Sequence, residues 1–389
     1  MNYVAVKPTL LRWAQKRSGQ SIQSLYKKIP KLKLWETGEA KPTLKQLEQF
    51  AKTVHTPIGY LFLDKPPIEK IPIPDFRKMP NVSQKNPSPD LLDTLYICQR
   101  RQDWYRDYMR SMKEEPLSFI GSVRPLASNI VKTAENIRKV LNFSIEERKK
   151  LTTWTSALSR FIEQANSVGI LVMVSGIVGS NNRRKLDPKE FRGFALSDTL
   201  APLIFINGAD TKAAQMFTIA HELAHLWINQ TAISNAQALA IPKHHIESWC
   251  NKVAAELLVP LNQIRQQCDN EKIKLNFSNE VQRLAKHFKV SSLVILRRIY
   301  DMKKLTAREF STRYEEELKK INEIQKKNKK SGGGDFFLTL RVRVSPRFAR
   351  ALVSHTLEGH TSFRESFQLL GVKKMSTFKE AGKSVGVKL

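Results

Sequence analysis

The stretch Met216-Phe-Thr-Ile-Ala-His-Glu-Leu-Ala-His-Leu-Trp227 decides the fold and the chemistry of this chain. Its polar side chains, Thr218, His221, Glu222 and His225, fall within about 100° of one face of a helix. The remaining positions are apolar, so the pattern predicts a helix that is buried nearly all round. Burying two histidines and a glutamate without partners is expensive. A bound metal ion is a partner that all three could share.

The spacing of these residues predicts a metal site with a base beside it. His221 and His225 stand four residues apart, so one helical turn directs both imidazoles to the same point, and Glu222 projects next to them. The alternative is a core helix with two hydrogen-bonded histidines and a salt-bridged glutamate. A catalytic zinc site needs three protein ligands and an open position for water. The metzincin extension is excluded, because Ile228 and Thr231 stand where its glycine and its third histidine would be.

The next predicted helix, residues 245–259, carries the candidates for the third ligand. Glu247 and Asn251 lie one turn apart at the edge of its apolar arc, whereas Glu256 lies on the opposite side and is expected to face water. A carboxylate followed four residues later by Asn suits a ligand together with a group that orients another ligand. Two alternatives stay open: Glu247 as an ordinary acid at a helix N-terminus, and one of the two histidines at 244–245 as the ligand.

At these two segments the chain resembles the ImmA/IrrE-type metallopeptidases, which are gluzincin-like enzymes. The resemblance is carried by FTIAHELAHLW and by IESWCNKVAAELLVP. Cys250 and Val253 depart from the family pattern, but both lie on the apolar arc and so alter packing, not ligation. The resemblance implies metal ligands and a catalytic acid/base, which are His221, His225 and Glu247 as ligands and Glu222 as the acid/base.

The metal expected at this site is Zn²⁺. Two imidazoles, one carboxylate and a water suit tetrahedral zinc, and the same ligands also hold Mn²⁺. We expect Glu222 to take a proton from the activated water and to pass it to the leaving amine.

The fold class expected is α+β and mainly helical. A small antiparallel sheet is expected to pack on the motif helix as a gluzincin-like core, with accessory helical domains around it. Short strands are predicted at 169–176, 191–198 and 201–207, after a helix that ends near 167. In the resembled family the edge of this sheet can pair with an extended peptide. A sheet that is only scaffold is equally compatible with the pattern.

The charge of the chain indicates an anionic partner. It contains 65 Lys+Arg against 36 Asp+Glu, which gives a formal net charge of +29. Nucleic acid is the favoured partner, and solubility alone is the alternative. No apolar run approaches the roughly 20 residues that span a bilayer, so no membrane partner is expected. Three cysteines without CxxC spacing, and no apolar leader, predict a cytoplasmic protein without disulfides.

The N-terminal part divides into two predicted regions. Residues 1–65 contain helical patterns at 10–16, 21–28 and 44–54, and WETGEAKPTLKQLEQFAK resembles the second half of a Cro/repressor-type helix-turn-helix domain. Pro30 is expected to distort the start of the recognition helix. DNA binding by this domain and a purely protein-contacting role both stay open. Residues 66–130 form a Pro-rich connection and a linking helix.

Three further regions follow along the chain. Residues 131–310 are the predicted metallopeptidase domain, whose segment 280–305 has a helix-turn-helix-like order or simply covers the active-site helices. Residues 311–334 are a basic helix and a Gly linker. Residues 335–389 form a small module of unreadable role, with an alternating pattern at FFLTLRVRVS followed by short helices.

Two functions follow from these patterns. The first is a metal-dependent regulatory endopeptidase that hydrolyses a specific cytoplasmic protein, such as a transcriptional repressor or an antitoxin. The alternative is a DNA-binding regulator or antitoxin component in which the metallopeptidase domain is mainly a recognition module. Glu222 favours the first, because a non-catalytic domain has no chemical need for it.

Overall fold

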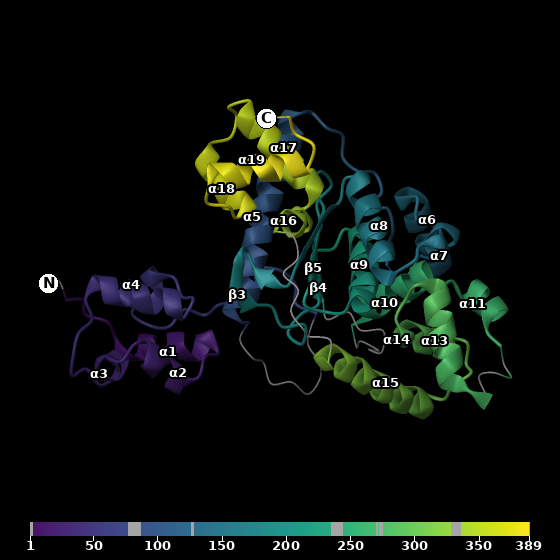
Figure 1. Cartoon of the computed structure of the whole chain (residues 1–389), viewed down its shortest axis with the longest axis horizontal. Helices are drawn as coiled ribbons and strands as arrows, with labels where there is room; N and C mark the ends of the chain where they lie inside the picture. Colours follow the sequence, from purple (N-terminus) through teal and green to yellow (C-terminus); the bar gives the residue numbers. More distant parts are fainter. Residues whose placement is uncertain are drawn as a thin grey trace. The chain divides into compact units, whose positions relative to one another are not determined.

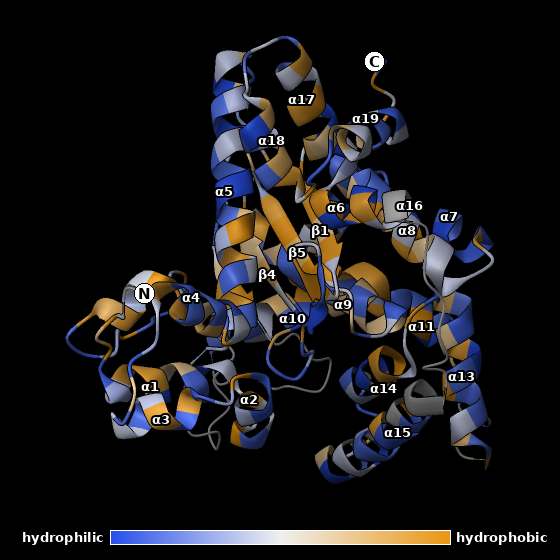
Figure 2. Ribbon diagram, turned by 60° about the vertical axis from the view of Figure 1, so that its left-hand side comes forward, coloured by the Kyte–Doolittle hydropathy of each residue, from blue (hydrophilic) through white to orange (hydrophobic). Residues whose placement is uncertain are grey.

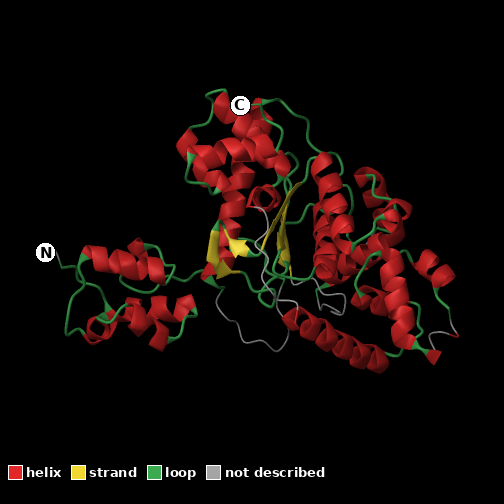
Figure 3. Ribbon diagram, viewed as in Figure 1, coloured by secondary structure: helices red, strands yellow, loops and turns green. Residues whose placement is uncertain are grey.

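The computed structural model describes most of the chain and divides it into two compact units. The units are Met1–Pro72 with Pro80–Leu95, and Ile73–Met79 with Tyr96–Leu389. The described residues are 3–76, 87–125, 128–234, 244–269, 271, 275–327 and 336–388. Helices dominate and the strands are few (Figure 3). The predicted α+β, mainly helical fold class is confirmed.

The first unit is a small helical domain with its own core. Its elements are α1 (Pro8–Ser18), α2 (Ile22–Lys28), α3 (Leu32–Thr37), α4 (Leu44–Thr53) and the 3-10 helix η1 (Ile58–Phe62). Leu10, Leu25, Trp35 and Phe50 are among its buried core residues. The three predicted helices are present. α3 is only six residues long and begins just after Pro30. DNA binding by this domain stays a prediction.

The second unit is built on a four-stranded sheet. Its strands are β1 (Leu171–Ser175), β4 (Gly193–Leu196), β5 (Leu203–Asn207) and β6 (Ala232–Ser234), in the order β1-β5-β4-β6. β1 is parallel to β5, and the other two pairs are antiparallel. The expectation of an antiparallel sheet was therefore wrong for one pair. The chain reverses once between β1 and β4 and again between β4 and β5, so β5 runs in the direction of β1.

A separate hairpin and an added segment complete the β structure. The hairpin consists of β2 (Ile177–Val178) and β3 (Asn181–Lys185), which lie between β1 and β4 in the sequence. The segment Pro74–Phe76 runs along β6: the Ile233 N–H donates to the Pro74 carbonyl at 3.0 Å, and the Phe76 N–H donates to the Ile233 carbonyl at 3.1 Å. The edge of β6 is thus paired by the chain itself.

The motif helix lies between the sheet and other helices. α9 (Lys212–Trp227) begins at the Thr211 cap and packs on β4 and β5, while α8 (Trp154–Ser167) and α10 (His245–Leu258) pack on it (Figure 1). Every residue from 215 to 227 is buried, as the pattern predicted. The buried strands are strongly apolar and appear in orange in Figure 2.

Further helices contribute to the same core as α9 and α10. They are α6 (Ile130–Leu141), α7 (Ile145–Lys150), α11 (Leu261–Gln267), α13 (Phe277–Phe288) and α14 (Ser292–Asp301). The helix α5 (Pro89–Ser111) precedes them in the chain. Val294, Ile295 and Leu296 of α14 belong to the same buried cluster as α9 and α10. The helix-turn-helix-like segment therefore forms part of the core that covers α9 and α10.

The C-terminal region is helical throughout its described part. It contains α15 (Ala307–Lys327), α16 (Phe336–Val344), α17 (Pro346–Leu357), α18 (Phe363–Leu370) and α19 (Met375–Ser384). The alternating pattern in FFLTLRVRVS forms the helix α16 and no strand. Leu340 and Val344, one helical turn apart, are buried, whereas Val342 is exposed. The predicted Gly linker at 331–334 lies outside the described residues.

Two further expectations concern the compartment. No helix in the described part of the chain is long and apolar enough to cross a bilayer. Cys98, Cys250 and Cys268 are all buried and free.

Candidate metal centre

The structure brings His221, His225 and Glu247 together in the buried core. The two histidines project from α9, and their Nε2 atoms lie 3.1 Å apart. Glu247 reaches them from the first turn of α10, with Oε2 3.3 Å from His221 Nε2 and Oε1 3.0 Å from His225 Nε2. One donor atom from each residue lies within 4.8 Å of the other two. Glu247 is 3% exposed, so the prediction that it faces the core is confirmed.

These separations fit a divalent cation. Zinc bound to nitrogen or oxygen at about 2.0–2.1 Å in a tetrahedral site places neighbouring donor atoms about 3.3 Å apart. The two Nε2 atoms lie 3.1 Å apart, and each faces a different oxygen of Glu247, at 3.3 Å for His221 and 3.0 Å for His225, so the nearest pairs of donor atoms are close to that value. A cation between the donors also compensates two inward-facing nitrogens and a carboxylate that are shielded from water.

Asn251 orients one of the two histidines. Its Oδ1 lies 2.9 Å from His221 Nδ1, one turn along α10 from Glu247. An amide oxygen only accepts, so the Nδ1–H of His221 donates to it and the Nε2 lone pair points at the other donors. His225 Nδ1 has no hydrogen-bond partner among the described residues.

Glu222 lies beside the ligand cluster and is held at one oxygen. The Ser234 hydroxyl, at the end of β6, donates a short hydrogen bond to Glu222 Oε1. Its other oxygen, Oε2, is buried and has no hydrogen-bond partner in the described part of the chain. Burial raises the pKa of the Glu222 carboxyl to about 8, although nearby His221 and Ser234 act in the opposite direction. A carboxyl with one fixed oxygen and one free oxygen can accept and return a proton.

The carboxyl of Glu247 has the opposite pKa shift. Burial raises its pKa, but the adjacent His221 and His225 outweigh burial and hold the pKa well below its usual range. Two buried carboxyls beside the same histidines therefore differ in their tendency to hold a proton. Glu247 is favoured as an anionic ligand, and Glu222 is favoured as a proton carrier.

Gly193 of β4 makes room for this arrangement. A Cβ at this position would lie 2.6 Å from Thr218 Cγ2, 2.9 Å from the Phe205 carbonyl oxygen and 3.3 Å from Glu222 Oε1. The strand and the motif helix approach so closely here that only a glycine fits without displacement.

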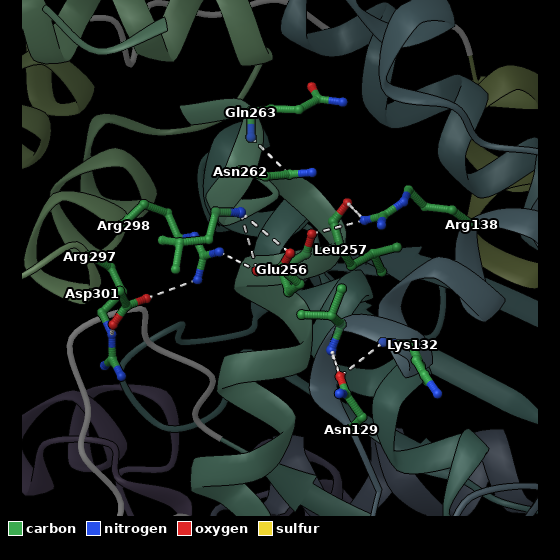
Figure 4. Close-up of polar contacts among 12 residues, drawn as sticks. Asn129, Lys132, Arg138, Glu256, Leu257, Asn262, Gln263, Arg297, Arg298 and Asp301 are labelled. Atoms are coloured by element: carbon green, nitrogen blue, oxygen red, sulfur yellow. Dashed lines mark hydrogen bonds and ion pairs between the residues drawn. The ribbon is translucent and has the colours of Figure 1, made fainter. Parts of the chain in front are cut away.

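Glu256 does not face water, so that expectation was wrong. It is 5% exposed and forms a short ion pair with Arg298 of α14 (Figure 4). It also accepts from the Leu261 N–H at 3.3 Å. The helical wheel of α10 alone could not show that α14 and α11 cover this side of the helix.

The histidines at the start of α10 lie outside the ligand cluster. The ring of His244 stacks on Phe76, with centroids 4.3 Å apart, and Phe76 also stacks on His225 at 6.2 Å. Sequence reasoning did not single out Phe76, Ser234 or Gly193. Only Gly193 carried a usable signal, since an isolated glycine within a strand pattern indicates a close approach of another element.

Comparison with known families agrees with this geometry. Residues 165–300 match the family model described as IrrE N-terminal-like domain, peptidase family M78. Residues 344–384 match the model of a domain of unknown function (DUF8813). None of the curated proteins matches the chain. The first match includes α9, α10 and the sheet, and the second includes α17, α18 and α19 up to its last residue.

Proposed function

We propose that this chain, in which residues 165–300 form an ImmA/IrrE-type metallopeptidase domain, is a regulatory endopeptidase that acts on one specific protein. The substrate class we propose is a transcriptional repressor or an antitoxin in the cytoplasm. One observation carries the proposal: three donor atoms of His221, His225 and Glu247 converge, and the unpartnered Oε2 of Glu222 lies beside them. A site used for recognition alone has no need of that second carboxylate.

The residues divide the chemistry between them. His221, His225 and Glu247 would hold a divalent ion, for which we propose Zn²⁺. When bound there, the ion supplies Lewis acidity that acidifies water and polarises a peptide carbonyl. Glu222 Oε2 receives the proton of the attacking water and returns it to the leaving amine, which completes hydrolysis without net change in the enzyme. Ser234 fixes Oε1, so Oε2 is the oxygen that is available to move the proton.

The burial of the site supports selectivity. The side chains of His221, Glu222 and His225 are wholly buried. In addition, Phe76 stacks on His225, and its segment pairs with the β6 edge next to Ser234. A peptidase that digests proteins at random needs an open cleft. A site covered in this way is suited to a substrate whose other contacts with the protein supply the free energy needed to displace the covering segment.

A trapping experiment tests the proposal. The Glu222→Gln variant should keep its metal and lose cleavage by at least about 10²-fold, the scale of general acid/base catalysis. Affinity purification of this variant from the native host, followed by mass spectrometry, should enrich one protein that the wild type cleaves at a defined bond. Glu135→Gln, a substitution of an exposed glutamate on α6, is the matched control and should cleave normally.

Two results would count against the proposal. Full cleavage of the trapped protein by Glu222→Gln would remove Glu222 from the mechanism. Recovery of nucleic acid with no enriched protein would instead favour the DNA-binding regulator in which the peptidase domain is a recognition module.

A further inference from the structure

A basic hollow lies between the β2–β3 hairpin and the end of α18. Its lining does not include any of the proposed metal ligands. Its volume is about 900 Å³. Three cationic side chains line it, which are Arg183 of β3, Arg364 of α18 and Lys373 just after α18. The residues that line it include no carboxylate. The hollow is thus lined by β3, within residues 165–300, and by α18, within residues 344–384, so both family matches contribute to it. Figure 1 labels β3 and α18.

The two walls of this hollow are fixed to each other. The Ser180 hydroxyl, at the hairpin turn, donates to the Gly371 carbonyl at 2.7 Å, and Arg343 Nη1 donates to the Ser180 oxygen at 3.2 Å. Gly371 ends α18 with φ 73°, and a Cβ there would lie 2.7 Å from Ser180 Oγ. Ser180 and Gly371, 191 positions apart in the sequence, therefore hold the hairpin and α18 in one geometry, so the three cations lie on one fixed surface.

The cations of the hollow have no anionic partner among the residues that the structure describes. Arg183, Arg364 and Lys373 are exposed and form no ion pair with another described residue. Glu365, the acid next to Arg364, lines a different hollow with His355 and His360. Like charges without counter-charges repel one another. A chain with net charge +29 has few surplus carboxylates to reduce this repulsion. An external polyanion removes that repulsion.

We propose that this hollow binds a single strand of nucleic acid. The cations suit its phosphates, and three side-chain amides in the lining, Asn181, Asn182 and Gln368, offer donors and acceptors to bases. Phe367 also lines the hollow, half-buried beside the rings of Phe363 and Phe378, and its exposed part supplies aromatic surface for stacking. A hollow of this volume is in the range of pockets that take up small molecules, so a few nucleotides of one strand fill it. An acidic protein segment would use the cations and the amides, but it has no bases to stack on the ring.

Fluorescence anisotropy with the full-length protein tests this assignment. The probe is a 5′-fluorescein-labelled oligothymidylate of about 12 nucleotides, within the site sizes of single-strand binders. Its affinity is measured against salt concentration for wild type and for the triple variant Arg183→Gln, Arg364→Gln, Lys373→Gln. Loss of three phosphate contacts should reduce the slope of log K against log salt by about 2. The variant Phe367→Leu, which keeps apolar volume, should bind at least about fivefold more weakly with the salt slope unchanged.

The matched control removes the same charge elsewhere in the second unit. Lys132, Lys139 and Lys252 are exposed on α6 and α10, and their joint replacement by Gln should leave both the affinity and the salt slope near wild type. Protection of Lys373 from acetylation by the bound oligonucleotide, detected by mass spectrometry, gives a readout that needs no variant.

Three outcomes would overturn the proposal. Equal losses in the triple variant and in the control would show only the general charge of the chain. Competition by poly-glutamate as effective as by the unlabelled oligonucleotide would assign the hollow to acidic proteins. Equal affinity for a duplex of the same length, with the same loss in the triple variant, would exclude the single strand. None of these results depends on peptidase activity.

Discussion

At the residue scale, Asn251 orients His221, one of the three side chains that we propose as metal ligands. Its Oδ1 accepts from His221 Nδ1 at 2.9 Å. We expect Asn251→Ala to weaken metal binding about 10–100-fold, the usual effect of losing such a hydrogen bond. Titration against a competing chelator measures this. Asn251→Asp keeps an oxygen acceptor and should bind metal more tightly than Asn251→Ala; equal weakening in both variants would indicate that packing, not the hydrogen bond, matters.

Gly193 makes a second residue-scale prediction. Because an added Cβ would lie 2.6 Å from Thr218 Cγ2, Gly193→Ala should lower the free energy of unfolding by about 1–3 kcal/mol. Urea denaturation of the second unit measures the change. In the double variant Gly193→Ala, Thr218→Ser, the closest atom is gone and part of the stability should return. If the double variant is no more stable than Gly193→Ala, the clash with Thr218 is not the cause.

Sequence patterns revealed the site residues that obey a helical period. The spacing of His221 and His225 and the wheel position of Glu247 placed all three correctly on buried faces. Ser234 could not be found this way, because its contact with Glu222 depends on how β6 pairs with β4. Such a contact joins two elements whose relative position is a property of the fold and not of either segment.

At the element scale, the ion pair between Glu256 and Arg298 joins α10 to α14. Both side chains are nearly buried, at 7% and 5% exposure, so breaking the pair leaves an uncompensated charge. We expect Arg298→Met to destabilise the protein by about 3–5 kcal/mol. The double variant Glu256→Gln, Arg298→Met should lose less, because no unpaired carboxylate is left in the core. A double-mutant cycle on urea unfolding measures the coupling, and additive effects would contradict a direct pair.

Prediction of elements failed where the sequence signal was short or ambiguous. The helix α16 was read as an alternating segment because its apolar residues occur at both helix and strand spacings, and packing on β1 and α19 decides the matter. The strand β3 reads Asn-Asn-Arg-Arg-Lys, with no apolar alternation, so its pairing with β2 was not foreseeable. The helices α9 and α10 were predicted well because they are long and their apolar residues follow the helical period.

At the scale of the whole molecule, metal binding should contribute to the stability of the second unit. An ion that binds only the folded state stabilises it by about 2.7 kcal/mol when its free concentration is 100 times Kd. Addition of a strong chelator should therefore lower the melting temperature of the wild type in calorimetry. His225→Ala lacks one of the proposed ligands, and the same chelator should leave its melting temperature unchanged. An equal decrease in both proteins would mean that the chelator acts elsewhere.

The pairing of Pro74–Phe76 with β6 has a kinetic consequence for any peptide that uses this edge. Such a peptide competes with the segment Pro74–Phe76 of the same chain. A covalently linked competitor reaches an effective concentration of about millimolar. Pro74–Phe76 lowers the apparent affinity of every peptide that binds the β6 edge by one common factor. That factor is the fraction of time for which the segment leaves the edge free. Phe76→Ala should therefore accelerate cleavage of two unrelated substrates by the same ratio, as measured by kcat/KM, whereas unequal ratios would mean that Phe76 selects among them. On the proposed function, the segment Pro74–Phe76 sets the overall rate of cleavage, and the substrate's other contacts determine which protein is cleaved.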